Sequence, residues 1–358
     1  NADLTLKAGD DVALSTLRAV GDVSVTSEEG GIQADPAVAE HIHGDNLFLS
    51  AAKSIGTTLS GLKTRVSNLY ATLTGSGDLY LEDVDALTVK ESSLADGNAQ
   101  LRTGADLTIE GLAVNGNARL DSAGRIVTGE DGLVRADNLQ ATAVDGIQLN
   151  SELDSASLAV TGEGDIDVDN GGDLRLDTVA AQDGDVDVRT DGDLDVDRVY
   201  TQGEHGIALT ASGAINAVGY GLVDGRYVTL RAGNGIGADA ALNLHAATLD
   251  ALSDSGDIDL TQSFGDLALE RVRTGDGDIS VTLGDGNLTL GDIHADGDVT
   301  LTAAQGRLDN DADDATLVSG DTVTLSSANG LGTESNNLVT RATRLDAQVS
   351  GAGDIHLT

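Results

Sequence analysis

The sequence predicts an all-β fold, a single three-sided parallel β-helix (β-solenoid) with about 20–21 residues in each turn. Three observations lead to this fold class. The chain repeats itself with that period, apolar and polar residues alternate in short runs, and Gly-Asp dipeptides separate the runs. A fixed repeat of this length is typical of solenoids, in which each unit buries its apolar face against the next unit.

The period can be read from equivalent residues. Leu174 recurs 20 residues later as Leu194, and Ile258 recurs 21 residues later as Ile279. Each repeat holds three short apolar stretches, so we expect three strands and three corners in every turn. Neighbouring turns should stack in parallel about 4.8 Å apart, which gives roughly 17 turns and a rod roughly 80 Å long.

The residue types fit these strands and corners. Alternation of apolar and polar residues predicts strands with one buried face. Gly reaches positive φ freely and Asp can bond to nearby backbone, so Gly-Asp dipeptides suit the corners. The chain has 46 Gly, one Pro, 2% aromatic residues and no Trp, Met or Cys. The core must therefore consist of Val, Leu, Ile and Ala, which suits a narrow interior.

A longer period lies above the single turn. The Gly of a Gly-Asp dipeptide within a shared phrase falls at Gly77, Gly164, Gly256 and Gly353, in steps of 87, 92 and 97 residues. A matching lead-in precedes three of these positions, at Ile55-Gly56, Ile236-Gly237 and Leu331-Gly332. We interpret residues 1–358 as one continuous domain of about four modules. Because Asn1 opens directly on the repeat, we expect the segment to come from a longer chain.

The charge excludes several classes of partner. The net charge is -40, with 20 Lys and Arg against 60 Asp and Glu, which provides no basic surface for nucleic acid. Anionic membrane surfaces would repel the chain, and no apolar run is long enough for a spanning helix, so we expect no membrane insertion. Unpaired strand edges at both ends favour end-to-end or side-by-side self-association.

The segment ANGLGTESNNLVTRATRLDAQVSGAGDIHLT, residues 328–358, resembles the repeat regions of filamentous-haemagglutinin-like exoproteins of the two-partner secretion class. Weaker copies lie at 55–81 and 236–260. The resemblance implies a right-handed β-helix exported to the surface of a Gram-negative bacterium. It also implies a role in adhesion, biofilm cohesion or delivery of a distant toxin.

Stacked aspartates are the candidates for a metal site. The 20-residue period places Asp165 beside Asp185 and Asp167 beside Asp187, and such like charges repel one another. Ca²⁺ could bridge them, because it prefers several carboxylate oxygens. Alternatively, the outward carboxylates are solvated and those at corners bond to backbone. We expect this second arrangement, and therefore neither a bound cofactor nor specific calcium.

Two histidines offer a second candidate. His41 and His43 are two residues apart, so on a strand both would face the same way and could hold a transition metal. The alternative, which we favour, is a polar loop near Pro36, where the repeat is irregular.

Enzyme activity is not expected. Carboxylate pairs occur throughout the chain and discriminate nothing, there is no Gly-x-Ser-x-Gly elbow, and aromatic platforms are scarce. Strings such as Thr-Leu-Thr suggest an ice-binding face, but we do not expect these threonines to recur in register on one side.

The leading interpretation is a structural stalk or spacer of a large bacterial adhesin or biofilm matrix protein. Other parts of the full chain would bind a host surface, a bacterial surface or a matrix component. Two alternatives stay open: a carbohydrate-binding or carbohydrate-cleaving β-helix, which aromatic residues grouped in a groove would favour, and the stalk of a contact-dependent toxin.

Overall fold

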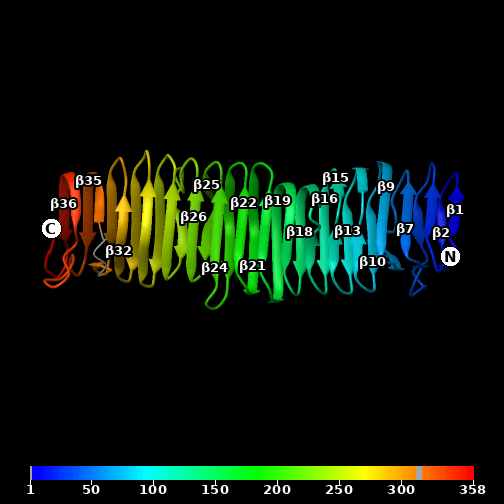
Figure 1. Ribbon diagram of the computed structural model, residues 1–358, viewed down its shortest axis with the longest axis horizontal. Helices are drawn as coiled ribbons and strands as arrows, with labels where there is room; N and C mark the ends of the chain where they lie inside the picture. The colour runs from blue at the N-terminus through cyan, green and yellow to red at the C-terminus, as the bar shows by residue number, and fades with distance from the viewer. Residues whose placement is uncertain (1, 312–316) are drawn as a thin grey trace. The chain divides into compact units, whose positions relative to one another are not determined.

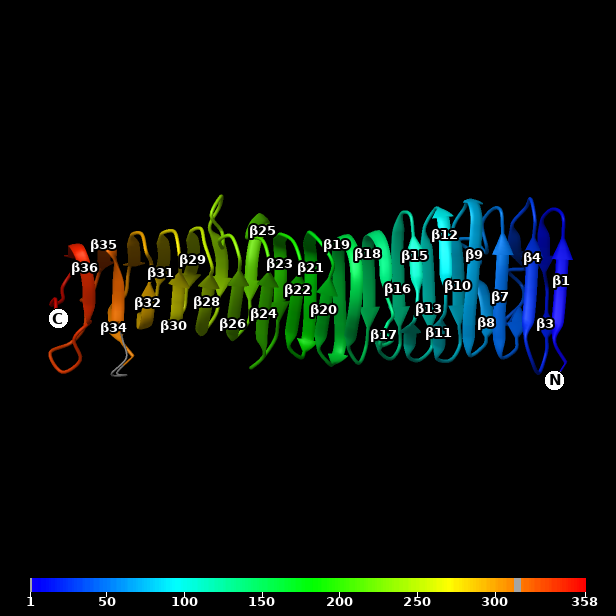
Figure 2. The ribbon, with the colours of Figure 1, turned by 45° about the horizontal axis from the view of Figure 1, so that its top comes forward.

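A computed structural model describes residues 2–311 and 317–358. The fold is all-β, without a helix in the described residues, and its parallel strands stack as a β-solenoid of about 16 turns. This confirms the predicted fold class. The chain divides into two compact units, residues 1–171 and residues 172–358. In Figures 1 and 2 the first unit runs from blue to green and the second from green to red.

The strands of the first unit are β1 (Leu4–Ala8), β2 (Val12–Leu14), β3 (Leu17–Arg18), β4 (Val23–Ser27), β5 (Ile32–Ala34), β6 (Ile42–His43), β7 (Asn46–Ala51), β8 (Leu62–Arg65), β9 (Asn68–Ser76), β10 (Leu79–Asp83), β11 (Leu87–Val89), β12 (Ser92–Asp96), β13 (Ala99–Thr103), β14 (Leu107–Ile109), β15 (Leu112–Val114), β16 (Asn117–Ser122), β17 (Ile126–Thr128), β18 (Val134–Ala143), β19 (Ile147–Glu163) and β20 (Ile166–Asn170).

The strands of the second unit are β21 (Leu174–Asp183), β22 (Val186–Thr190), β23 (Leu194–Thr201), β24 (Gly206–Ala211), β25 (Ile215–Asp224), β26 (Tyr227–Ala232), β27 (Leu242–His245), β28 (Thr248–Ser253), β29 (Ile258–Phe264), β30 (Leu267–Thr274), β31 (Ile279–Asp285), β32 (Leu288–His294), β33 (Val299–Ala303), β34 (Leu308–Asn310), β35 (Leu317–Ser327) and β36 (Thr340–Val349).

Three strands make one turn where the repeat is most regular. In the first unit β10, β11 and β12 form one turn, and they pair in parallel with β13, β14 and β15 of the next turn. In the second unit the registers are those that the sequence predicts. Leu174 pairs with Leu194, and Ile258 pairs with Ile279. The turn length of 20 to 21 residues is therefore confirmed at these positions.

The core of each unit is a set of aliphatic columns. Leu174, Leu194 and Ile215 lie above one another in three successive turns, and each is at most 1% exposed. Along each strand, the residues that alternate with the buried ones point outward. Strand β26 is an example, because its burial alternates from residue to residue. Complete burial of one such side chain stabilises the fold by about 1.5–3 kcal/mol. Because each layer contacts mainly its two neighbours, stability is close to a sum over turns.

Small polar side chains occupy some inward positions at the corners. Thr201 donates its hydroxyl to the carbonyl of Gly184 (2.6 Å), and Thr274 donates to the carbonyl of Gly256 (2.7 Å). Both threonines are buried, and a buried hydroxyl without a partner would be costly. These hydroxyls therefore bind the corner backbone to the core.

The structure explains why each of the three lead-in dipeptides ends in Gly. Gly56, Gly237 and Gly332 all have φ between 62° and 69°, a conformation that favours glycine. A Cβ at each position would also lie within 2.6 Å of a carbonyl oxygen in the following turn. Only glycine fits there, so the three lead-ins are equivalent positions. The interpretation of the whole chain as one continuous domain of four modules stays a prediction.

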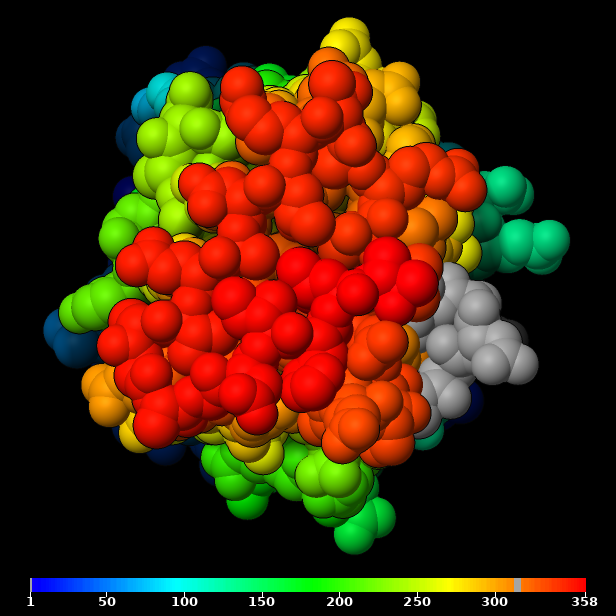
Figure 3. Space-filling model, turned by 90° about the vertical axis from the view of Figure 1, so that its left-hand side faces the viewer, coloured from blue at the N-terminus to red at the C-terminus, as the bar shows by residue number. Residues whose placement is uncertain are grey.

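The last turn of the second unit exposes apolar side chains. Leu345 on β36 pairs with Val323, yet Leu345 is 43% exposed whereas Val323 is fully buried. Figure 3 looks onto this turn, which is drawn in red. The predicted end-to-end self-association would cover this face, and it stays a prediction.

The core columns give a first test. Leu194→Asp would place an unpaired charge in the interior, and we expect it to lower the free energy of unfolding by more than about 3 kcal/mol. Asp195→Ser changes the next residue on the same strand, which points outward and accepts a hydrogen bond from Asn216. This control should cost less than about 1 kcal/mol. Thermal melts that ranked the two variants in the opposite order would show that the faces are wrongly assigned.

Candidate functional site

The Asp of the Gly-Asp dipeptide links successive turns. In the second unit the N–H of Asp193 donates to Oδ1 of Asp173 (2.9 Å), and the N–H of Ala214 donates to Oδ1 of Asp193 (2.8 Å). The same contact occurs in the first unit, where Oδ1 of Asp78 accepts from the N–H of Asn98 (2.8 Å). A charged acceptor makes a comparatively strong hydrogen bond to backbone. The predicted bonding of corner aspartates to backbone is therefore present at these corners.

The Gly of the dipeptide makes room for this carboxylate. A Cβ on Gly192 would lie 2.1 Å from Oδ1 of Asp173, and a Cβ on Gly297 would lie 2.2 Å from Oδ1 of Asp278. Gly213, which precedes Ala214, has the same short distance to Oδ1 of Asp193 (2.0 Å). Such distances are far below van der Waals contact. At these corners Gly is needed because it accommodates the acceptor of the preceding turn.

Gly213→Ala tests this explanation. We expect a loss of about 1–3 kcal/mol in the free energy of unfolding, because the methyl group collides with the Asp193 carboxylate. Adding Asp193→Ala should reduce the cost of the methyl group, which a double-mutant cycle would detect. Gly9→Ala is the control, since a Cβ there meets nothing within 4 Å. Equal losses for Gly213→Ala and Gly9→Ala would contradict the explanation.

Asparagines form a comparable ladder in the first unit. The amide of Asn98 donates to Oδ1 of Asp78 (3.0 Å), that of Asn117 donates to Asn98 (2.9 Å), and that of Asn138 donates to Asn117 (2.7 Å). The hydroxyl of Ser155 closes the ladder on Asn138. The sequence analysis missed this ladder, although its signal is visible as Asn at intervals of 19 and 21 residues.

Two of the calcium candidates lie in the second unit, next to β22. Asp185 accepts the N–H of Gly206 (2.7 Å) and lies 3.5 Å from Nδ1 of His205. Asp187 forms an ion pair with Arg189 on the same strand. Both carboxylates therefore already have positive or N–H partners within this unit.

The other two candidates lie in the first unit. Asp165 and Asp167 line a surface hollow of about 230 Å³ together with Asp145 and Arg125. Across residues 2–311 and 317–358, no three His, Cys, Asp or Glu side chains are arranged to hold a metal. Each predicted stack joins a residue of one unit to a residue of the other, and the expectation of no specific calcium there stays a prediction.

His41 and His43 do not share an environment. His41 is fully buried, its Nε2 lies 2.9 Å from the carbonyl oxygen of Asp35, and its Nδ1 accepts the N–H of Lys63 (2.9 Å). Because Nδ1 accepts, the ring is neutral and carries its proton on Nε2. His43 is half-exposed on β6, with Nδ1 3.5 Å from Oε1 of Glu40. Both nitrogens of His41 are thus occupied, and the pair does not offer a metal two free imidazoles.

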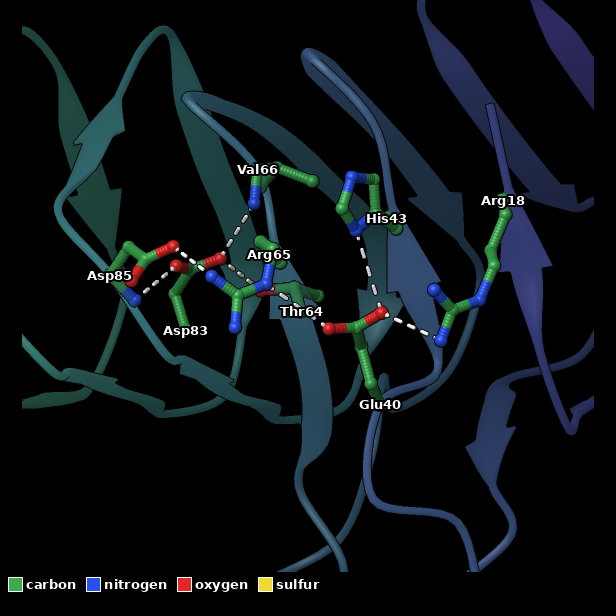
Figure 4. A network of polar contacts seen from close by, with 8 residues as sticks. All are labelled: Arg18, Glu40, His43, Thr64, Arg65, Val66, Asp83 and Asp85. Atoms are coloured by element: carbon green, nitrogen blue, oxygen red, sulfur yellow. Dashed lines mark hydrogen bonds and ion pairs between the residues drawn. The ribbon is translucent and has the colours of Figure 1, made fainter. Parts of the chain in front are cut away.

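Glu40 is the centre of a cluster of charges (Figure 4). Arg18 lies 3.1 Å from its Oε1, and Nε of Arg65 donates to Oε2 (3.2 Å). Burial raises the pKa of Glu40, but the hydrogen bond from Arg65 and the charges of the two arginines outweigh it, so the pKa is lowered overall. Arg65 also forms an ion pair with Asp85. The cluster joins β3, β8 and the loop before β6.

Asp83 in the same view has the opposite shift (Figure 4). It is 1% exposed, and burial raises its pKa although three hydrogen bonds lower it. The hydroxyl of Thr64 (2.6 Å) and the N–H groups of Val66 and Asp85 (3.0 Å each) donate to its carboxylate. Because its oxygens face these donors in the interior, Asp83 cannot serve as an acid or base for a substrate. Its role is to hold the backbone that follows β8 in place through the N–H of Val66.

His205 gives a test by pH. Its pKa is raised, chiefly by the hydrogen bond to Asp183 (2.6 Å) and further by the charge of Asp185. A raised pKa means that protonation stabilises the folded state, so this contribution is present below about pH 6.5 and is lost as the pH rises through the folded value. We expect the melting temperature of the parent chain to exceed that of His205→Gln most at acidic pH. Asp183→Asn should reduce this pH dependence, because only the charge of Asp185 remains, and a difference that does not change with pH would contradict the assignment.

The expectation that threonines do not recur in register is wrong for the second unit. Thr282 pairs with Thr302 and Thr302 with Ser326, while Ser280 pairs with Thr300 and Thr300 with Thr324. The step from Thr282 to Thr302 is 20 residues, and the step from Thr302 to Ser326 is 24 residues. The paired strands therefore keep two outward rows of hydroxyls aligned although the step varies.

Comparison with known proteins gives no relative. The chain matches no family model, no curated protein and no solved structure. The resemblance to haemagglutinin-like exoproteins therefore stays an interpretation of the repeat. Among the described residues, no helix has the length and apolar character needed to cross a membrane.

Proposed function

We propose that this chain is a structural stalk or spacer of a large bacterial adhesin or biofilm matrix protein. The observation that carries the proposal is the use of its carboxylates. Corner aspartates such as Asp173 and Asp193 accept backbone N–H groups of the next turn, so they join turns together. An enzyme would instead gather its ionisable groups in a cleft around a substrate. We therefore propose no catalytic activity.

The surface charge supports the same role. A net charge of -40 keeps neighbouring copies apart and keeps the chain soluble. The stacked acidic side chains are compensated locally, as where Arg231 and Arg271 each lie 2.8 Å from Asp250. These three residues come from three successive turns, so the charges strengthen the contacts between turns.

The place of action and the partners follow from the proposal. A stalk of this kind would stand at the surface of a Gram-negative bacterium or be released from it. Other parts of the full chain would bind the host surface, a neighbouring bacterium or the matrix. The stalk of a contact-dependent toxin would use the same segment, and the toxin would then lie elsewhere in the full chain.

A distance measurement tests the spacer. The chain has no Cys, so Lys7→Cys and Arg341→Cys introduce two unique labelling sites. We expect single-molecule energy transfer to give one narrow distance of about 80 Å, from a rise of about 4.8 Å in each turn. Lys7→Cys with Lys90→Cys, both in the first unit, calibrates the rise over fewer turns.

The spacer proposal also predicts how divalent cations affect this distance. The distance should be the same in Ca²⁺ and in Mg²⁺ at equal ionic strength, because the charges are only screened. A broad distribution, or a separation much shorter than expected, would show that the segment does not hold its ends apart. The stalk proposal would then fail.

A further inference from the structure

Four successive corners of the second unit form a hollow that the stalk function does not use. Residues within 201–203, 224–226, 245–247 and 262–266 line a volume of about 360 Å³, which we call the corner groove. The hollow of the first unit that Asp165 and Asp167 line has about 230 Å³. The volume of the corner groove lies at the lower end of the range of ligand pockets, about 300–1,000 Å³, so the groove can hold part of a small ligand.

The floor of the corner groove is held in place. Gln262 is 1% exposed, and its side-chain amide accepts the N–H of Ala246 (2.9 Å) and donates to the carbonyl of the same residue (3.1 Å). Gly265 follows with φ +90°, which lets the chain bend sharply after β29. The groove therefore has a fixed shape before any ligand binds.

The walls carry polar groups of both signs. Nδ1 of His245 lies 2.8 Å from Oδ1 of Asp224, and Nε of Arg226 lies 2.7 Å from Oε2 of Glu204. Asp224 and Arg226 of the lining thus have polar side-chain partners, and Asp266 accepts the N–H of Asn287 (2.7 Å). The terminal amino groups of Arg226 and the second ring nitrogen of His245 add hydrogen-bonding capacity to that of the carboxylate oxygens. Such a set can both donate to and accept from hydroxyl groups.

An aromatic side chain stands at the rim. Phe264 is 60% exposed, and its ring centroid lies 4.9 Å from that of His245. Tyr227, 48% exposed, lies beside Arg226, whose Nε donates to the tyrosine hydroxyl (3.2 Å). The chain has only two Phe and five Tyr, and two of these rings contact residues that line the groove, His245 and Arg226. Aromatic residues grouped at a groove are the feature that favours carbohydrate binding.

We infer that the corner groove binds a neutral oligosaccharide. A pyranose ring has polarised C–H groups on one face, which pack on the negative face of an aromatic ring such as Phe264. Its hydroxyl groups would bond to Asp224, His245 and Arg226. A polyanionic glycan would be repelled by the acidic chain. This binding activity goes beyond the spacer role.

Titration calorimetry on the intact chain tests the inference. The ligands are cellohexaose, xylohexaose, chitohexaose and maltohexaose, with heparin as the polyanion. We expect at least one neutral hexasaccharide to bind with a dissociation constant below about 1 mM, a typical weak affinity. Phe264→Ala should weaken binding at least about tenfold, equivalent to about 1.4 kcal/mol. Asp224→Asn removes the charged partner of His245 and keeps the side-chain volume. This variant should also bind the oligosaccharide more weakly than the parent chain.

Phe48→Ala is the matched control. Phe48 is also partly exposed, at 37%, and stacks on Tyr70 in the first unit, away from the corner groove. Its removal should leave binding unchanged, and melting curves should show all three variants folded. Absence of binding by every neutral sugar at millimolar concentration would overturn the inference. Binding of heparin in their place, or equal losses in Phe264→Ala and Phe48→Ala, would overturn it too, and none of these outcomes would affect the stalk proposal.

Discussion

The hydrogen-bonded register between successive turns is the constraint on which the rest of the structure depends. A slip of one residue would exchange the two faces of a strand, so that Leu194 would point outward and Asp195 inward. The corners prevent this slip. Oδ1 of Asp173 fixes the N–H of Asp193, and the same oxygen would lie 2.1 Å from a Cβ on Gly192. Charge and shape together thus select one alignment at each turn.

The same constraint explains how so acidic a chain folds. Stacking places equivalent side chains one strand spacing apart, where like charges repel. The structure relieves this repulsion in the direction of stacking, through backbone N–H donors at the corners and through arginines on the strands. Asp250 shows the second device. Burial raises its pKa, but the hydrogen bonds from Arg271 and Arg231 lower it more, so the carboxylate stays charged between two cations.

Sequence reasoning succeeds here where the repeat is regular and fails where it is interrupted. The strands, the 20-residue register of Leu174 and Leu194 and the lead-in glycines follow from period and alternation. The aligned rows of hydroxyls through Thr282 and Thr302 were missed, because the step between paired residues varies from 20 to 24 along the same row. The burial of His41 was also missed, since its partners are backbone groups that no residue pattern reveals.

Departures from the repeat indicate where a solenoid can acquire a binding site. A strand position is tied to its neighbours above and below, so a change there disturbs three turns, whereas a corner tolerates insertion. Phe264 illustrates this freedom. It ends β29 at a corner, and the residue in register with it on the next turn is Asp285, so the exposed ring is not part of a repeated column. A purely structural corner has no need of an exposed aromatic ring, which loses free energy in water. The inferred binding at the corner groove would give this exposed ring a role that stability alone does not.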